Sequence, residues 1–395
     1  MTDNMNRITG TLALNPTLLD DNLKLNVNAT GSRTSNNFAD RGAIGSAVNF
    51  DPTQTIYKDY GEEDPGIQRF GGYYTWLNNE NNPTVLAPAN PLALINLRTD
   101  ESEAQRIIGN VQADYSFPFL PELSANLNLG YDYSKSEGEV YVPYYAPWSY
   151  QVNPDRDGGS RVAYNQEKKN ELLDFYLNYV KEFDEISSKF DVMGGYSWQH
   201  FWRSDYSYST NDFQSEDTKQ VYYDKTTPTE LYLISFFGRF NYSLMNRYIL
   251  TFTLRNDGTS RFSPQSRWGI FPSYALAWKI KEESFLKDLD IISELKLRLG
   301  YGKTGQQDIG GHYAYLGTFV NSQSSADYIF GNDTITTSRP SGYDANIKWE
   351  ETVTKNIGID YGFLDNRIEG SVEYYIRETN DLLNVIPVPA GTNFT

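Results

Sequence analysis

Residues 123–134 read LSANLNLGYDYS, a stretch in which apolar and polar side chains alternate one by one. Successive side chains of a β-strand point to opposite faces, so Leu127 and Leu129 share one face, and Asn126 and Asn128 share the other. A helix does not keep this period of two. The stretch therefore predicts a strand with one apolar face and one polar face.

The same alternation recurs along the whole chain and predicts an all-β protein. Twelve candidate strands follow from it, at 6–14, 22–33, 104–117, 122–136, 168–182, 187–205, 230–244, 247–256, 266–281, 293–303, 348–363 and 367–383. Most of them exceed the five or six residues that are common in soluble sheets, and they match the 9–11 tilted residues that span a bilayer. We expect an antiparallel sheet of transmembrane strands.

The connections between these segments alternate between short and long. Short links that read as tight turns join the members of successive pairs, at 16–21, 118–121, 183–185, 245–246 and 364–366, and a longer one, 282–292, is expected to hold one helical turn. Links rich in Gly, Asn, Pro, Ser and Tyr separate the pairs, notably at 34–103, 137–167, 206–229 and 304–347. This sorting places tight turns at one end and long loops at the other, as in an outer-membrane barrel with short periplasmic turns and long extracellular loops.

Aromatic residues near the strand ends support a membrane position. In segment 266–281, Trp268 and Trp278 fall on the same face. At about 3.3 Å per residue and a tilt near 40°, their separation along the membrane normal is roughly 25 Å, the height of the apolar band between aromatic girdles. Other residues near strand ends extend the pattern: Tyr131, Tyr133, Trp198, Trp202, Tyr361 and Phe363.

Some apolar residues depart from the alternation. Leu172, Phe201 and Ile234 fall on the face opposite the better apolar row of their segments. Arg239 and Phe240 leave the register of segment 230–244 ambiguous, and we expect a β-bulge there.

Composition excludes several classes of protein. The 395 residues carry 34 Lys and Arg against 51 Asp and Glu, a net charge of −17, which argues against a nucleic-acid binder. The sequence has no cysteine, so disulfides and thiolate metal sites are excluded, and no apolar run of about 18 residues predicts a transmembrane helix. The first residues, MTDNMNRITG, do not read as a signal peptide, and we expect the chain to be an internal piece of a longer protein.

No motif for catalysis or for a cofactor stands in a suitable context. Gly300 to Gly305 match G-x-G-x-x-G, but no helical pattern follows to bind a pyrophosphate, and Asn153 to Gly158 resemble a calcium loop whose twelfth position is Tyr164 in place of Glu. His200 and His312 lie far apart, and paired carboxylates are common in a chain this acidic. We expect no enzyme activity, no cofactor and no metal site.

Two aromatic runs on long loops are the candidates for ligand or partner contact. The first comprises Tyr144, Tyr145, Trp148 and Tyr150, and the second Tyr74 and Trp76. Exposed aromatic rings can stack on sugars or anchor a protein partner. The alternative is that the loops pack against one another over the mouth of the barrel.

Several longer motifs resemble the barrel of SusC/RagA-type TonB-linked transporters. They are LRNDGTSRF at 254–262, RWGIFPS at 267–273, LKLRLGYGKTGQ at 295–306 and WEET at 349–352, with NRITG at 6–10 and FADRG at 38–42. The resemblance covers nearly the whole chain. It implies that residues 1–395 are part of a 22-stranded outer-membrane β-barrel domain, with signal peptide, plug and terminal strands absent.

The resemblance also implies a function and partners. These are uptake of oligosaccharides or peptides, a SusD-like surface lipoprotein, and energy from a TonB–ExbB–ExbD complex that acts through the missing N-terminal parts. Outer-membrane lipid surrounds such a barrel, and no nucleic acid is involved. A passive porin or barrel adhesin, and a soluble glycan-binding β-protein, remain as alternatives.

Overall fold

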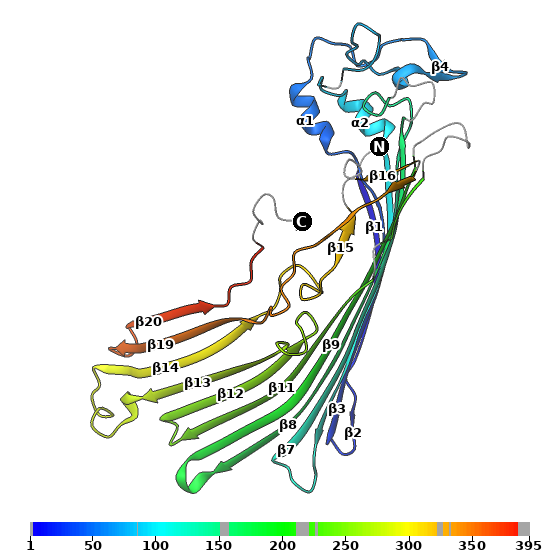
Figure 1. Cartoon of the computed structure of the whole chain (residues 1–395). Helices are drawn as coiled ribbons and strands as arrows, with labels where there is room; N and C mark the ends of the chain where they lie inside the picture. Colours follow the sequence, from blue (N-terminus) through cyan, green and yellow to red (C-terminus); the bar gives the residue numbers. More distant parts are fainter. Residues whose placement is uncertain are drawn as a thin grey trace.

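A large curved antiparallel sheet makes up most of the molecule (Figure 1). The computed structural model describes residues 3–84, 86–150, 158–210, 221–225, 228–321, 327–331 and 333–385. Its main strands are β1 (Asn4–Leu14), β3 (Leu23–Asn37), β6 (Thr99–Ser116), β7 (Leu123–Val142), β8 (Ser160–Phe183), β9 (Ser188–Thr210), β11 (Thr229–Leu244), β12 (Tyr248–Thr259), β13 (Trp268–Lys279), β14 (Ile292–Gln306), β19 (Glu350–Phe363) and β20 (Ile368–Asn380). All twelve predicted strands are confirmed.

Each main strand pairs with its neighbours in chain order, from β1 to β20. The short strands β2 (Thr17–Leu18) and β10 (Val221–Lys225) add to β3 and β9. In the described part of the chain, β1 and β20 stand at the two ends of this order, so the sheet is open.

The remaining elements lie in the long connections. Between β3 and β6 are α1 (Gly42–Asn49), β4 (Glu62–Asp64), β5 (Ile67–Gln68), the 3-10 turn η1 (Arg69–Gly72) and α2 (Pro91–Leu97). Between β14 and β19 are β15 (Phe319–Asn321), β16 (Tyr328–Phe330), β17 (Asp333–Ile335) and β18 (Ser338–Pro340), which pair as two small ribbons. Figure 1 shows α1, α2 and β4 beyond one end of the strands.

Tight turns join the strands at the opposite end. Met245 and Asn246 both have positive φ, 51° and 52°, as a two-residue hairpin turn that follows the right-handed twist of its strands requires. Leu364, Asp365 and Asn366 also have positive φ. The longer connection between β13 and β14 begins with the 3-10 turn η4 (Ile280–Glu282), and another, η2 (Asp184–Ile186), lies between β8 and β9. The predicted separation of short and long connections is therefore confirmed.

The strand boundaries predicted from the alternation agree with the structure at the ends joined by tight turns, and agree less well at the ends joined by long loops. β8 begins at Ser160 rather than near 168, and β9 ends at Thr210 rather than near 205. In these outer segments both faces carry polar residues, as in Asn165 to Asn170, so no alternation marks the strand. The long strands continue well beyond the predicted membrane segment.

The register of β11 corrects one expectation. β11 pairs with both β9 and β12 without a register shift, so the expected bulge near Arg239 is wrong. Ile234 lies on the same face as Phe236 and Phe240, because the pairing keeps even-numbered residues of β11 together. Apolar residues such as Leu233 also occupy the opposite face, which obscured the alternation. A register shift occurs instead in β14, between Ile292 and Glu294.

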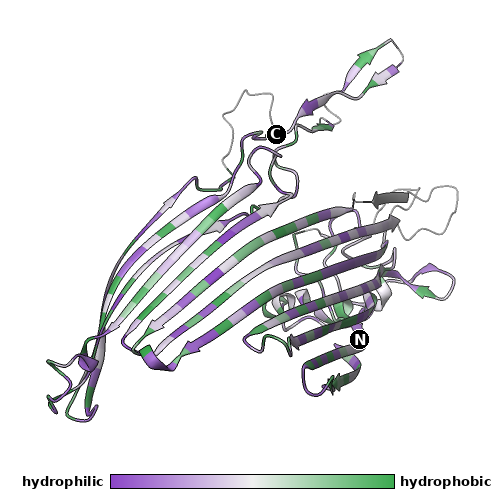
Figure 2. Ribbon diagram, turned by 90° about the horizontal axis from the view of Figure 1, so that it is seen from below, coloured by the Kyte–Doolittle hydropathy of each residue, from purple (hydrophilic) through white to green (hydrophobic). Residues whose placement is uncertain are grey.

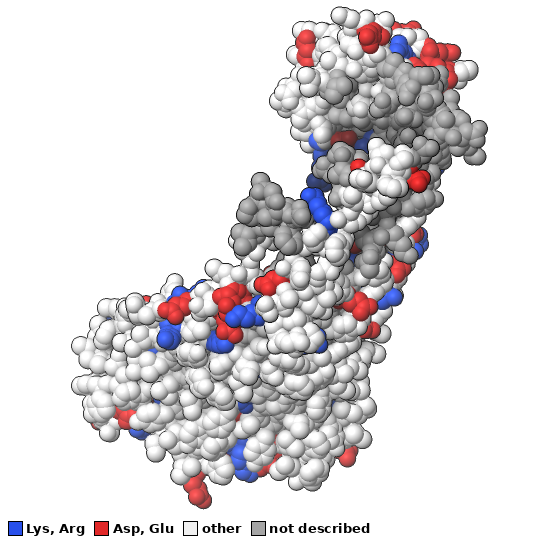
Figure 3. All heavy atoms as spheres, in the orientation of Figure 1, with Lys and Arg blue, Asp and Glu red and all other residues white. Residues whose placement is uncertain are grey.

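One face of the sheet carries an exposed apolar band. Leu129, Ile270 and Val372, on three separate strands, are 44%, 58% and 64% exposed. Figure 2 shows hydrophobic and hydrophilic residues alternating along the strands, and Figure 3 shows few charged side chains over the lower wall that faces the viewer. This arrangement is that of a barrel wall with its apolar face toward lipid and its polar face toward the lumen.

Aromatic residues lie at both edges of the apolar band. Trp268 and Trp278 share the face, as predicted, because β12 and β13 pair without interruption. At the turn end, Trp278 stacks with Tyr248 at 6.3 Å and donates a hydrogen bond from Nε1 to Glu283 (2.9 Å). Among the described residues, no helix is both long enough and apolar enough to cross a membrane.

Replacing Leu129 by Lys is expected to lower the free energy of unfolding by about 2–4 kcal/mol, because the charge enters the lipid-facing band. Asn128→Lys, one position along on the lumen face, is the matched control and is expected to change it by less than about 1 kcal/mol. Denaturant titration of the whole transporter refolded in lipid, followed by heat-modifiable gel mobility, measures both. Equal losses in the two variants would contradict the assignment of faces.

Candidate binding site at the loop end of the sheet

The connection between β3 and β6 folds into a compact unit, residues 38–98, which with 143–150 we call the loop cap. Asn90 joins helix α2 to the segment around Ile56, because its side chain caps the helix and also hydrogen-bonds the Ile56 backbone. Its Oδ1 accepts from the Leu92 N–H (3.1 Å), and its Nδ2 donates to the Ile56 carbonyl (2.8 Å). Asn90 is only 2% exposed. The Pro91 that follows occupies the first helical turn, where a missing N–H costs nothing.

Phe70 lies at the centre of the loop cap and is fully buried. Its φ is 56°, a left-handed conformation that is costly for a residue with a large side chain. Aromatic rings surround it edge-on, with Tyr60 at 5.2 Å and Tyr150 at 5.0 Å between ring centroids. The burial of this ring among aromatic neighbours compensates for the strained backbone.

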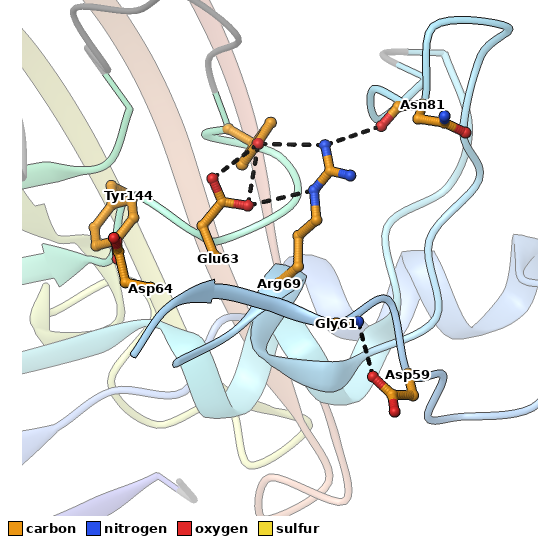
Figure 4. Close-up of polar contacts among 8 residues, drawn as sticks. Asp59, Gly61, Glu63, Asp64, Arg69, Asn81 and Tyr144 are labelled. Carbon is orange, nitrogen blue, oxygen red and sulfur yellow. Dashed lines mark hydrogen bonds and ion pairs between the residues drawn. The ribbon is translucent and has the colours of Figure 1, made fainter. Parts of the chain in front are cut away.

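A polar cluster joins the two parts of the loop cap (Figure 4). The Arg69 guanidinium contacts the Glu63 carboxylate (Nε to Oε2, 3.3 Å) and donates to the Tyr150 hydroxyl (3.3 Å). The Tyr150 hydroxyl in turn donates to Glu63 (3.1 Å to Oε1), and the Tyr144 hydroxyl donates to Asp64. Burial chiefly raises the pKa of Tyr150, so this hydroxyl keeps its proton and its role as a donor at neutral pH.

The six aromatic candidates fall into two groups. Tyr144 is buried and Tyr150 half-buried, and both bind carboxylates of the loop cap, as the packing alternative expects. Tyr145 packs edge-on against Tyr144 at 5.4 Å. Trp148, 38% exposed, keeps the largest ring available for contact.

Tyr74 and Trp76 are half-buried and pack against each other. Their ring centroids lie 5.2 Å apart, and Phe50 contacts both rings. The Lys58 ammonium lies 5.5 Å from the Tyr74 ring centroid, a cation–π contact. Both aromatic runs thus belong to one packed unit at the loop end of the sheet.

A second aromatic cluster, missed by sequence reasoning, lies at the rim between β13 and β14. This rim cluster consists of Phe262, Phe271 and Trp349, all less than 8% exposed, with Ile347 and Leu383 packed against it. Ring centroids of Trp349 lie 5.8 Å from Phe262 and 5.2 Å from Phe271. The indole Nε1 donates to the Arg267 carbonyl (2.9 Å), so the cluster ties the β12–β13 connection to the start of β19.

The rim cluster gives a physical role to the motifs that carry the family resemblance. β13 pairs with β14 from Lys279 at the turn end to Ser273, which lies opposite Gly302. Beyond this last pair, toward the loop end, the rim cluster packs between the two strands. A Cβ on Gly305 would lie 2.2 Å from the Phe271 ring and 2.8 Å from the Trp349 ring. Gly305, the last glycine of the G-x-G-x-x-G match, therefore leaves space for the rings of Phe271 and Trp349. It lies near the end of strand β14, and irregular chain rather than a helix follows that strand.

Neither histidine lies in a metal-binding arrangement. His200, on β9, stacks on Tyr232 at 4.3 Å and hydrogen-bonds Glu171 (Nδ1 to Oε2, 2.9 Å), whereas His312 lies in the β14–β19 connection. Burial chiefly, and the nearby Arg261 charge, lower the pKa of His312. Among the described residues no group of three or more His, Asp or Glu could hold a metal ion. The calcium-like stretch, Asn153 to Asp157, lies outside the described residues.

The curved wall, its two-faced strands and its loop cap define a transmembrane β-barrel protein. Residues 54–395 match the family described as TonB dependent receptor-like, beta-barrel, and the chain belongs to this family of Gram-negative outer-membrane proteins. The whole chain is 41% identical to the TonB-dependent receptor SusC of Bacteroides thetaiotaomicron, and 78% of it is 31% identical to the TonB-dependent receptor P39 of Formosa agariphila. The predicted resemblance and outer-membrane location are confirmed.

The chain spans 39% of the length of SusC and 29% of the length of P39. The solved structure of the RagAB peptide transporter superimposes on 98% of this chain with a TM-score of 0.72, at 20% identity, and the match covers 42% of that transporter chain. This likeness concerns the fold. The open sheet superimposes on one part of that transporter chain.

Gly305→Ala is expected to lower the free energy of unfolding by about 1–3 kcal/mol, because the added methyl overlaps Phe271 and Trp349. Gly302→Ala on the same strand is the control, since its Cβ meets only Ser273 Oγ, at 3.8 Å. Denaturant unfolding of the whole transporter, with Trp fluorescence as the signal, compares them. If Gly302→Ala destabilises as much, the rim cluster is not the cause.

Arg69→Leu is expected to make local opening of the loop cap easier by about 1.5–3 kcal/mol, because the half-buried Glu63 loses its cation. Tyr150→Phe removes only the hydroxyl and is expected to give a smaller effect. Hydrogen exchange of peptides covering 59–81 and 143–150, read by mass spectrometry, measures both. Unchanged exchange in Arg69→Leu would show that the polar cluster does not hold the loops.

Proposed function

We propose that the chain forms part of the wall and surface loops of a SusC-type importer that takes up oligosaccharides or peptides across the outer membrane. The observation that carries this proposal is the 41% identity to SusC over the whole chain. The lipid-facing apolar band and polar lumen face supply the wall that such a transporter needs. Family membership argues against the porin, adhesin and soluble alternatives.

The proposal includes partners beyond this chain. A SusD-like surface lipoprotein covers the loop end, and a TonB–ExbB–ExbD complex acts on a plug inside the barrel through N-terminal parts of the whole transporter. Residues 1–395 then form a partial barrel domain of that transporter. No group transfer is involved, because the substrate is bound, enclosed and passed on without breaking a bond.

The loop cap is the proposed contact surface for substrate or lipoprotein. Trp148 is its most suitable contact, because its ring is exposed, whereas Tyr144 and Tyr150 bind the carboxylates of Asp64 and Glu63. Tyr145, Tyr74 and Trp76 are partly exposed and complete the proposed surface.

The experiment that tests the function uses the native transporter tagged at its chromosomal locus. Outer-membrane fractions solubilised in detergent are purified by the tag and examined for a co-purifying lipoprotein, and cells are grown on neutral oligosaccharides or on peptides as the sole carbon source. We expect a stable complex and a growth defect on one of these substrates when the gene is deleted. A transporter that purifies alone and whose loss affects neither growth condition would contradict the proposal.

Trp148→Ala is expected to weaken lipoprotein or substrate binding by about tenfold, because an exposed Trp at an interface contributes on the order of 1–2 kcal/mol. Phe285→Ala is the matched control, since Phe285 is 67% exposed but lies in the connection between β13 and β14, at the turn end. Titration of the purified complex by calorimetry measures both. Equal binding affinities of the two variants would show that Trp148 does not contact the lipoprotein or the substrate.

A further inference from the structure

One connection at the turn end differs from the tight turns beside it. Residues 280–291 join β13 to β14 and begin with the 3-10 turn η4 (Figure 1). Three apolar side chains of this connection, those of Phe285, Leu289 and Ile291, are 67%, 46% and 60% exposed. Exposed apolar side chains grouped in this way are typical of a surface that contacts a partner or a membrane.

Lys281 holds this connection in an ordered conformation. Its Nζ donates to the carbonyls of Leu286 (3.1 Å), Lys287 (3.0 Å) and Leu289 (2.9 Å). The Leu286 N–H and the Lys287 N–H both donate to the Glu283 carbonyl, at 2.9 and 2.8 Å, and close a turn within the connection. The exposed apolar side chains are therefore carried by a turn with its own hydrogen bonds.

Glu283 places the connection on the lipid-facing side of the wall. Its Oε1 accepts a hydrogen bond from Trp278 Nε1 (2.9 Å) and another from the Tyr248 hydroxyl (2.5 Å). These two aromatic residues are paired across β12 and β13 and lie at the edge of the apolar band, on the face opposite the lumen. The sheet itself therefore separates Glu283 from the lumen and from any plug within the lumen.

The same hydrogen bonds indicate the depth of the connection in the membrane. Trp and Tyr of an aromatic girdle lie at the level of the lipid headgroups, where their polar atoms find hydrogen-bond acceptors. For Trp278 and Tyr248 the acceptor is a carboxylate of the protein, so Glu283 lies at the headgroup level. Hydrogen bonds from Tyr248 and Trp278 lower the pKa of Glu283, and the carboxylate stays ionised at neutral pH.

Charge gives this connection little attraction to a membrane surface. Residues 279–291 contain three lysines and four carboxylates, which nearly cancel. Lys281 is bound to backbone carbonyls, and Arg247 beside the connection pairs with Glu283 (Nη1 to Oε2, 3.4 Å). Burial of apolar surface is therefore the main force that can hold the connection at a bilayer.

We propose that residues 280–291 form an interfacial anchor, which inserts Phe285, Leu289 and Ile291 into the inner leaflet of the outer membrane. The occupant of this apolar surface is phospholipid, because the surface continues the lipid-facing band past its aromatic edge at the periplasmic end. Glu283 is the positioning residue, since it ties the anchor to Trp278 and Tyr248. The proposal rests on the outer-membrane location of the barrel and does not depend on the imported substrate.

The test uses the whole transporter in vesicles of phosphatidylethanolamine and phosphatidylglycerol, with a nitroxide label on a single cysteine and any other cysteines replaced by serine. Phe285→Cys and Leu289→Cys carry the label within the anchor. Leu276→Cys, on the lipid-facing band, is the reference in lipid, and Asp184→Cys, exposed in the tight turn η2, is the reference in water.

Electron paramagnetic resonance compares collisions of each label with oxygen, which concentrates in the bilayer, and with a nickel chelate, which stays in water. We expect the oxygen-to-nickel ratio at 285 and 289 to exceed the ratio at 184 at least about threefold, because an interfacial anchor lies roughly 5–10 Å into the boundary of headgroups and acyl chains. The ratio at 276 gives the upper reference.

Labels at 285 and 289 that meet nickel as often as the label at 184 overturn the proposal. This holds even if native outer-membrane vesicles shield them, because a periplasmic protein is then the occupant. Heat-modifiable gel mobility shows which variants are folded barrels, and Leu289→Cys decides the question if Phe285→Cys does not fold.

Glu283→Ala, made in the Phe285→Cys background, tests the positioning role. It is expected to raise the released population of the anchor about tenfold or more, as for the loss of hydrogen bonds to a charged group, and so to increase nickel collisions at 285. Glu283→Gln keeps an acceptor oxygen and is expected to restore protection. Glu282→Ala, which removes the neighbouring exposed carboxylate, is the matched control, and equal protection in Glu283→Ala and Glu282→Ala would contradict the role of Glu283.

Discussion

Continuous backbone pairing is the constraint on which this structure depends. Lipid offers no hydrogen-bond partner to an N–H or C=O group, so a strand in the bilayer must bond to neighbours on both sides. From β3 to β19 every main strand does so, in chain order and with few irregularities. The same constraint applies to the outer edges of β1 and β20, which stand at the two ends of the described sheet. Side chains then differ by face, because one face meets lipid and the other water.

Much of this could be predicted from the sequence because strand alternation and tight turns are local signals. The faces of Leu127 and Asn128 follow from their immediate neighbours in the sequence, and Met245 and Asn246 form a tight turn between two predicted strands. The prediction failed where both faces have similar polarity. β11 carries Leu233 and Ile234 on opposite faces, so its register could be determined only from its partners.

The contacts of the site were beyond sequence reasoning because they join distant residues. Glu63 and Tyr150 meet across 87 positions, and Trp349 reaches Arg267 across 82. The aromatic runs were recognisable as unusual, but nothing local distinguished Tyr150, which binds a carboxylate, from Trp148, which remains exposed. The motifs around Gly305 could be matched to a family, while the packing that explains them required the folded rim.

The two tryptophans of β13 have a consequence for where the barrel can reside. Interfacial aromatic residues resist movement into either the hydrocarbon or the water, so Trp268 and Trp278 fix the thickness of membrane that the wall tolerates. A bilayer thicker than their separation must thin around the protein or force it to tilt, at a cost that rises with each ångström of hydrophobic mismatch. The bacterial outer membrane is thinner than average, and the spacing of these rings suits that membrane over thicker ones.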